Sequence, residues 1–181
     1  MIDEIKVLKI VVKRLESARI PYMITGSIAS NFYTTPRMTR DIDIVIEVEE
    51  EDAGTLFSLF STDFYVDKNS IINAIHNKQI FNIIHREGIV KVDFIIRKDT
   101  NYRNLEFKNR RSIVFERQKI FIVSPEDLIL SKLFWARESL SEMQIRDVNN
   151  LFKTIHNLDR GYIEKWVHEL ELDAVYNEVK K

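Results

Sequence analysis

A strict alternation of side chains over residues 41–48 constrains the fold more than any other feature of this sequence. One set of alternate side chains is entirely apolar and the other begins with two aspartates: Ile42, Ile44, Ile46 and Val48 against Asp41, Asp43, Val45 and Glu47. Successive side chains of a β-strand point to opposite faces of a sheet, so this period of two predicts a strand with one buried face. Asp41 and Asp43 then share the other face, roughly 6–7 Å apart along the chain.

The segments around this strand predict a sheet mixed with helices. Short apolar runs bounded by turn residues predict the other strands: 22–25, 64–66, a hairpin of 79–85 and 89–97, and a hairpin of 112–115 and 119–123. Apolar residues at helical spacing predict the helices: 2–18, 27–33, 50–61 and a turn at 70–74. We therefore expect an α/β (α+β) fold in which helices flank a mixed central sheet.

The pattern changes at Ser124-Pro125-Glu126-Asp127, which is typical of a helix start. Serine is a preferred N-cap, proline fits the first helical position, and Asp127 lies three residues after the cap. From there to Lys181 the sequence favours helix throughout. These observations predict two parts, a core of residues 1–123 and a helical C-terminal lobe of residues 124–181.

Composition limits the classes of function. The 181-residue chain has no cysteine, which excludes thiol catalysis, thiolate zinc sites and disulfides. It also lacks the Gly-x-x-x-x-Gly-Lys loop of a P-loop kinase. The N-terminal residues carry acids, and no apolar run approaches the ~18 residues that span a bilayer. We therefore expect a cytoplasmic protein without a signal peptide or a membrane partner.

The net charge of −1 does not by itself indicate a nucleic-acid partner, but the charge is unevenly distributed. Residues 97–119 hold eight lysines and arginines against three acids. A local basic patch can gather a polyanion such as RNA even when the whole molecule is nearly neutral. A solvated hairpin explains the same residues equally well.

Three separate pieces of sequence predict one kind of chemistry. The first is Gly26-Ser27, where a strand runs into a helix. Glycine lets a phosphate approach the backbone, and the helix N-terminus supplies free N–H groups; many purely structural turns have the same form. The second is Asp41-Ile42-Asp43, whose carboxylates can converge on Mg²⁺, or can belong to the solvated face of an edge strand.

The third piece is Asp93, which lies between apolar residues on a predicted strand. An ionised carboxylate among apolar neighbours is costly unless a cation or hydrogen bonds compensate it. A metal ion would supply that compensation. A salt bridge to an arginine or to Lys91 is the alternative.

The order and spacing of these pieces resemble the nucleotidyltransferase superfamily, which includes DNA polymerase beta. The resemblance is strongest over residues 24–44, where Gly26-Ser27 precedes Arg37-Met38-Thr39-Arg40-Asp41-Ile42-Asp43. It implies a minimal nucleotidyltransferase fold. It also implies two Mg²⁺ ions, or Mn²⁺, both bound by Asp41 and Asp43 and one of them by Asp93.

The C-terminal segment 124–132 and the later Arg146-Asp147 resemble the AbiEii-type branch, which contains toxins of bacterial toxin–antitoxin pairs. This resemblance implies that Lys132 meets a nucleoside triphosphate and that Asp147 positions or deprotonates the acceptor. Without it, Lys132 reads as a solvated helix lysine. Gly26, Ser27, Arg37, Arg40 and Lys132 are the predicted nucleotide-binding residues.

The predicted activity is transfer of a nucleoside monophosphate from a nucleoside triphosphate to an acceptor hydroxyl. The acceptor would be an RNA such as tRNA, or a protein, and a toxin would also have a cognate antitoxin as partner. An antibiotic-modifying nucleotidyltransferase is one alternative, for which a deep acidic pocket would favour an aminoglycoside. A regulatory protein that kept the fold and lost turnover is another, although all three aspartates are present.

Overall fold

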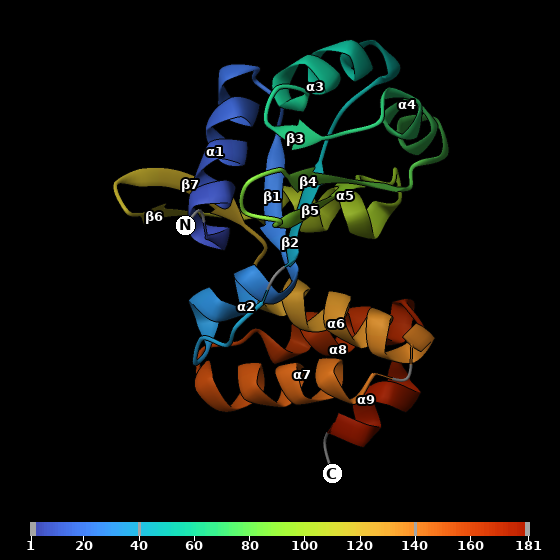
Figure 1. Ribbon diagram of the computed structural model, residues 1–181. Helices are drawn as coiled ribbons and strands as arrows, with labels where there is room; N and C mark the ends of the chain where they lie inside the picture. The colour runs from blue at the N-terminus through green and yellow to red at the C-terminus, as the bar shows by residue number, and fades with distance from the viewer. Residues whose placement is uncertain (1–2, 40, 140, 180–181) are drawn as a thin grey trace.

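The computed structural model describes residues 3–39, 41–139 and 141–179. In these ranges the chain forms a seven-stranded mixed sheet with helices on both faces. Figure 1 shows that α1 and α3 lie beside the sheet, while α6 to α9 gather into a helical lobe next to α2. The strands are β1 (Tyr22–Thr25), β2 (Asp41–Ile46), β3 (Phe64–Tyr65), β4 (Ile80–His85), β5 (Lys91–Ile96), β6 (Arg111–Phe115) and β7 (Gln118–Ile122).

The strands lie in the order β3-β4-β5-β2-β1-β7-β6. The central strand β2 pairs with β5 in parallel and with β1 antiparallel. β1 in turn pairs with β7 in parallel, while the β3–β4, β4–β5 and β6–β7 pairs are antiparallel. The mixed sheet flanked by helices and the C-terminal helices are confirmed.

The helices begin and end near the predicted places. They are α1 (Glu4–Ser17), α2 (Gly26–Tyr33), α3 (Ala53–Phe60), α4 (Lys68–Asn77), α5 (Asn101–Lys108), α6 (Pro125–Ser139), α7 (Glu142–Thr154), α8 (Arg160–Glu169) and α9 (Asp173–Val179), with a 3₁₀ turn at Glu50–Asp52. Asp3 caps α1 by accepting a hydrogen bond from the backbone N–H of Lys6. The predicted helix over 50–61 is thus a 3₁₀ turn followed by α3.

Two helices differ from expectation. α4 is longer than the predicted turn, because Asp67 caps its first turn and Lys78 ends it in the left-handed conformation. α5 was not predicted at all. Its buried residues are Tyr102, Glu106 and Phe107, so its inner face includes a charged residue and gives no clear apolar period.

The faces of the sheet pack against different partners. Ile42, Ile44 and Ile46 of β2 join a buried cluster with residues of α1 and α3. On the opposite face, Met23 and Val45 join a buried cluster with residues of α5, α6 and α8. The C-terminal helices are therefore held by apolar packing against the same sheet face that carries Asp43 and Asp93. Within the described ranges, no helix is long and apolar enough to cross a bilayer.

Candidate active site

Asp43 and Asp93 lie side by side on neighbouring parallel strands. Asp43 of β2 is in register with Asp93 of β5 on one side and with Thr25 of β1 on the other. Asp41 precedes Asp43 by two residues, in register with Lys91. Asp43 and Asp93 are half-buried and Asp41 is exposed. The strand register therefore puts the three predicted carboxylates on one face at one end of the central strands.

The charges of these carboxylates act on one another. Burial, together with the charges of Asp93 and Asp41, raises the pKa of Asp43 to about 6. The positive charges of Lys132 and Lys91 act in the opposite direction. Lys91 also forms an ion pair with Asp93, Nζ to Oδ2 at 2.9 Å. The lysine partner for Asp93 is therefore present. The raised pKa of Asp43 indicates a place where added positive charge is favourable.

Gly26 allows the chain to pass close to Asp43. It is the first residue of α2, and its φ of +63° lies in the left-handed region that side chains rarely adopt. A Cβ built at this position would overlap the carboxylate of Asp43. The glycine thus brings the start of α2 directly against the carboxylate row, as a phosphate site at that helix end would require.

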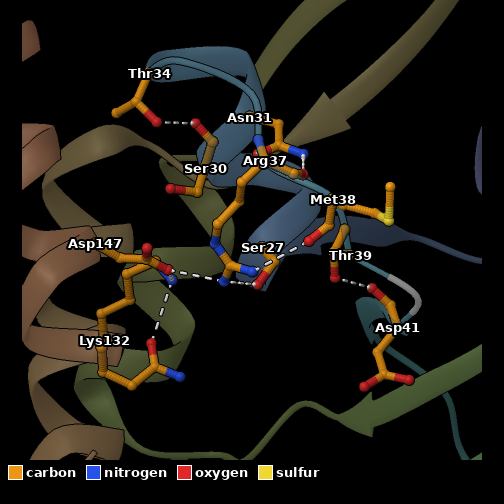
Figure 2. A network of polar contacts seen from close by, with 11 residues as sticks. Ser27, Ser30, Asn31, Thr34, Arg37, Met38, Thr39, Asp41, Lys132 and Asp147 are labelled. Carbon is orange, nitrogen blue, oxygen red and sulfur yellow. Dashed lines mark hydrogen bonds and ion pairs between the residues drawn. The ribbon is translucent and has the colours of Figure 1, made fainter. Parts of the chain in front are cut away.

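A network of ion pairs connects α2 with the C-terminal lobe, and Figure 2 shows its members. Arg37 donates to Ser27 Oγ at 2.7 Å and to Asp147 Oδ2 at 3.1 Å. Lys132 of α6 donates to the same Asp147 oxygen at 2.7 Å. Asn31 holds the Arg37 backbone through hydrogen bonds at 2.9 and 3.0 Å. Residues far apart in the sequence thereby meet in one cluster.

Lys132 is buried in this cluster, with 3% of its surface exposed. Burial lowers its pKa, although the bond to Asp147 opposes the change. Burial would raise the pKa of Asp147, yet its bonds from Lys132 and Arg37 hold that pKa below its ordinary value. The attraction between Lys132 and Asp43 lowers the pKa of Asp43 and raises that of Lys132. The reading of Lys132 as a solvated lysine is wrong.

The predicted site residues that the structure describes therefore lie close together. Gly26 and Ser27 begin α2, the carboxylates lie beside it, and Arg37, Lys132 and Asp147 form the network next to Ser27. Arg40 lies outside the described residues.

The carboxylates suit a divalent cation in their chemistry. Among the described residues, no three acidic or histidine side chains already converge as a metal-binding group. Asp41, Asp43 and Asp93 nevertheless offer the oxygen donors that Mg²⁺ prefers, and their mutual repulsion at Asp43 is what a cation would relieve. Lys91 is ion-paired with Asp93 Oδ2, so a cation would compete with Lys91 for that oxygen.

A cavity of about 820 Å³, which was not predicted from the sequence, is lined by residues next to the carboxylates on the sheet. Thr25, Val45 and Ile95 form its floor on the sheet; α5, α6 and α8 form its walls. Both tryptophans of the chain line it. Trp166 is buried and does pack, whereas Trp135 is 45% exposed. The exposed Trp135 on α6 was a signal of this cavity. The cavity could not be located from the sequence, because its wall on α5 was not predicted.

The mixed seven-stranded sheet with its flanking helices matches the fold of solved nucleotidyltransferases. No family model matches the chain, and no curated protein resembles it in sequence. Solved structures do. The lincosamide antibiotic adenylyltransferase LnuA, solved with lincomycin bound, is 15% identical with a TM-score of 0.57, covering 83% of this chain and 97% of its own.

Two further structures extend this likeness. ANT(2″)-Ia in complex with adenylyl-2″-tobramycin is 12% identical, with a TM-score of 0.59 over 98% of this chain and 97% of its own. An antigenic nucleotidyltransferase-like protein from Paracoccidioides brasiliensis is 19% identical, with a TM-score of 0.55 over 93% and 89%. At these identities the likeness defines the fold. The AbiEii-type resemblance stays a prediction.

Proposed function

We propose that the chain is a nucleotidyltransferase, which transfers a nucleoside monophosphate from a nucleoside triphosphate to an acceptor hydroxyl. The observation that carries the proposal is the register of Asp43 with Asp93, beside a glycine that brings the start of α2 against Asp43. The acceptor oxygen would bond to the α-phosphorus as the bond to pyrophosphate breaks. The products are the nucleotidyl ester, pyrophosphate and the proton of the hydroxyl.

The start of α2 and the neighbouring cations would hold the triphosphate. Ser27 and the N–H groups at the start of α2 supply hydrogen-bond donors, and the helix dipole favours negative charge there. Arg37 already reaches Ser27, and Lys132 lies beside the same network. Arg40 is a further candidate from the sequence.

Asp41 and Asp43 would bind two Mg²⁺ ions, or Mn²⁺, and Asp93 would bind one of them. Such ions, when bound, activate an acceptor hydroxyl and neutralise the charge on the triphosphate. The contribution of the chain is positioning: the β2–β5 register fixes the spacing of Asp43 and Asp93, and Gly26 lets the start of α2, where the triphosphate would bind, approach Asp43.

Asp147 would act on the acceptor once its partners change. It now shares one oxygen between Lys132 and Arg37. A triphosphate carries several negative charges and competes for both cations, which releases the Asp147 carboxylate. Asp147 is then available to position the hydroxyl or take its proton.

A small molecule is the acceptor favoured by the cavity, and an antibiotic-modifying activity is the corresponding second candidate. Of the structural neighbours, LnuA is a lincosamide antibiotic adenylyltransferase, and ANT(2″)-Ia was solved in complex with adenylyl-2″-tobramycin. A toxin with a cognate antitoxin rests on the AbiEii-type resemblance of residues 124–132 and Arg146-Asp147, whereas an RNA acceptor rests on the basic segment 97–119. Part of that charge is compensated within the chain: Arg97 pairs with Glu47, Arg103 with Glu106, and Arg111 with Glu126.

The test is to incubate the protein with each labelled nucleoside triphosphate, Mg²⁺ and fractions of a cell extract separated into small molecules, RNA and protein. Label should enter one fraction with wild type and none with Asp43→Asn. Absence of transfer from all triphosphates to all fractions would favour the regulatory protein that kept the fold without turnover.

A further inference from the structure

The cavity lies next to the carboxylate row: the three aspartates are not among its lining residues, but their neighbours on the sheet are. Thr25, in register with Asp43, lines one end. Val45 and Ile95 come two residues after Asp43 and Asp93 on the same face, and Lys98 follows the end of β5. Strands rise roughly 3.3 Å per residue, so the distance from Asp93 to Ile96 alone is about 10 Å. A molecule in the cavity can thus present one end to the carboxylates and the other to Lys98.

Aromatic side chains form much of the cavity wall. They come from α5, α6 and α8: Tyr102, Phe134, Trp135 and Trp166. The rings of Tyr102 and Trp166 pack together, with centroids 4.9 Å apart. A cavity of this size and lining suits a flat apolar body of the dimensions of a drug-sized ligand.

The charged residues of the lining are mostly basic. Among the described residues they are Lys78, Arg97, Lys98 and Arg103 against Glu106. A buried acidic lining, as an aminoglycoside would require, is therefore missing from the described part of this cavity. The single acid, Glu106, is already engaged by Arg103 at 2.8 Å and by Ser131 at 2.7 Å.

Most of the positive charge is also compensated. Arg97 pairs with Glu47 and Asp99, and Lys78 lies 3.9 Å from Asp99. Lys98 is exposed, and its side chain makes no ion pair or hydrogen bond to any residue that the structure describes. One uncompensated cation at the far end matches a ligand with one negative charge better than a polycation or a polyanion.

We infer that the acceptor is a hydroxylated molecule with an aromatic body and one anionic group at the end opposite its hydroxyl. The inference rests on the proposed function in making this ligand the acceptor; the ligand class rests on the cavity alone. The aromatic body lies between Trp135 and the sheet, the anion meets Lys98, and the hydroxyl points to Asp43. Its oxygen bonds to the α-phosphorus, its proton leaves, and pyrophosphate is the leaving group.

The probe is 6-hydroxy-2-naphthoate, with its neutral methyl ester and the polycation tobramycin as comparisons. Calorimetry measures affinity, and fluorescence reports the place, because both tryptophans of the chain line the cavity. The naphthoate should bind at one site and quench that fluorescence, the ester should bind more weakly, and tobramycin should not bind.

Two matched charge reversals test the role of Lys98. Lys98→Glu should weaken naphthoate binding on the order of fivefold and leave the ester unchanged. Lys68→Glu makes the same change at an exposed position in the first turn of α4, away from the cavity, and should alter neither. Equal naphthoate affinity in wild type and Lys98→Glu, or tobramycin binding tighter than the naphthoate, would overturn the inferred ligand class.

Labelled triphosphates separate this inference from the proposed function. Transfer of label to the naphthoate by wild type, but not by Asp43→Asn that still binds it, supports both. Transfer to a cell-extract acceptor by a protein that does not bind the naphthoate overturns the ligand class and leaves the transferase standing. Lys98-dependent binding without transfer from any triphosphate supports the ligand class and overturns its role as acceptor.

Discussion

On β2 the faces of the central sheet can be compared residue by residue. Ile42, Ile44 and Ile46 are fully buried against α1 and α3, and they need nothing beyond apolar neighbours. Asp43 faces the opposite side, where its surroundings come from Gly26, from Asp93 and from the distant Lys132. The apolar face is specified by local pattern, whereas the carboxylate face is specified by which distant residues the topology brings to it. Changes on the former should therefore cost stability, and changes on the latter should cost activity.

Asp43→Asn is expected to give the largest effect and to separate the two faces most clearly. Transfer should fall at least on the order of 1000-fold, since one neutral amide removes charge from the centre of the carboxylate row. The midpoint of thermal unfolding should stay the same or rise, because the substitution removes a half-buried charge next to two others. Turnover and calorimetric melting measure the two effects. A strong fall in stability would show that this face, too, is needed for folding.

Ile44→Ala tests the opposite face at the next position along β2. Ile44 is fully buried, so we expect a loss of about 3 kcal/mol in the free energy of unfolding from lost burial and the cavity left behind. Denaturant unfolding measures the loss. The kcat of the remaining folded protein should stay near that of wild type. A large fall in kcat with full stability would contradict the division between the faces.

Lys132→Ala sharpens the comparison, because Lys132 is both buried and part of the carboxylate face. The substitution leaves Asp147 with Arg37 as its remaining partner, so we expect a loss of about 2 kcal/mol in stability rather than the larger cost of an isolated charge. A solvated helix lysine, as the sequence alone suggested for Lys132, would instead have predicted almost no change in melting temperature.

The control for Lys132→Ala is Lys165→Ala in the same lobe. Lys165 is largely exposed, and its pairing with Glu169 is of the weak surface kind. Its loss should change stability by less than about 0.5 kcal/mol. Equal melting temperatures for both variants would mean that the buried bond to Asp147 contributes nothing to the fold.

Apart from the control, Asp63→Asn should give the smallest effect, and it lies on the apolar side of the sheet. Arg14 donates two hydrogen bonds to the Asp63 carboxylate, at 2.6 and 2.7 Å, and these hold its pKa below the ordinary value. A lowered pKa in the folded state gives stability that is present above the ordinary value and lost as pH falls through the folded one. Because both groups are part-exposed, the loss at pH 7 should be about 0.5 kcal/mol. Melting at pH 7 and near pH 2 measures it, and the difference from wild type should vanish at the lower pH.

The sequence predicted the strands well because their signal is local. Alternation over 41–48 and the apolar runs around it depend on neighbours a few residues apart, and β2 and β5 appear where expected. Asp41, Asp43 and Asp93 were found through a spacing that resembles a known superfamily. Their register across β2 and β5 followed only from the structure.

The sequence missed what depends on distant packing. α5 buries Tyr102 and Glu106 against the C-terminal lobe, and a buried glutamate is possible there because Arg103 and Ser131 bond to it. No local pattern records that compensation. The burial of Lys132 depends in the same way on Asp147, and the cavity exists only because α5, α6 and α8 meet over the sheet.

The pairing of β1 with β7 has a consequence for synthesis on the ribosome. β1 is an inner strand, yet its partner on one side is β7, through the parallel pair of Ile24 with Ile122. Until residue 122 has emerged, β1 is an open edge with unpaired N–H and C=O groups, and such edges invite pairing with other chains. Parallel pairs so distant in sequence also close slowly. The nascent chain should therefore depend most on chaperones between the emergence of β5 and that of β7.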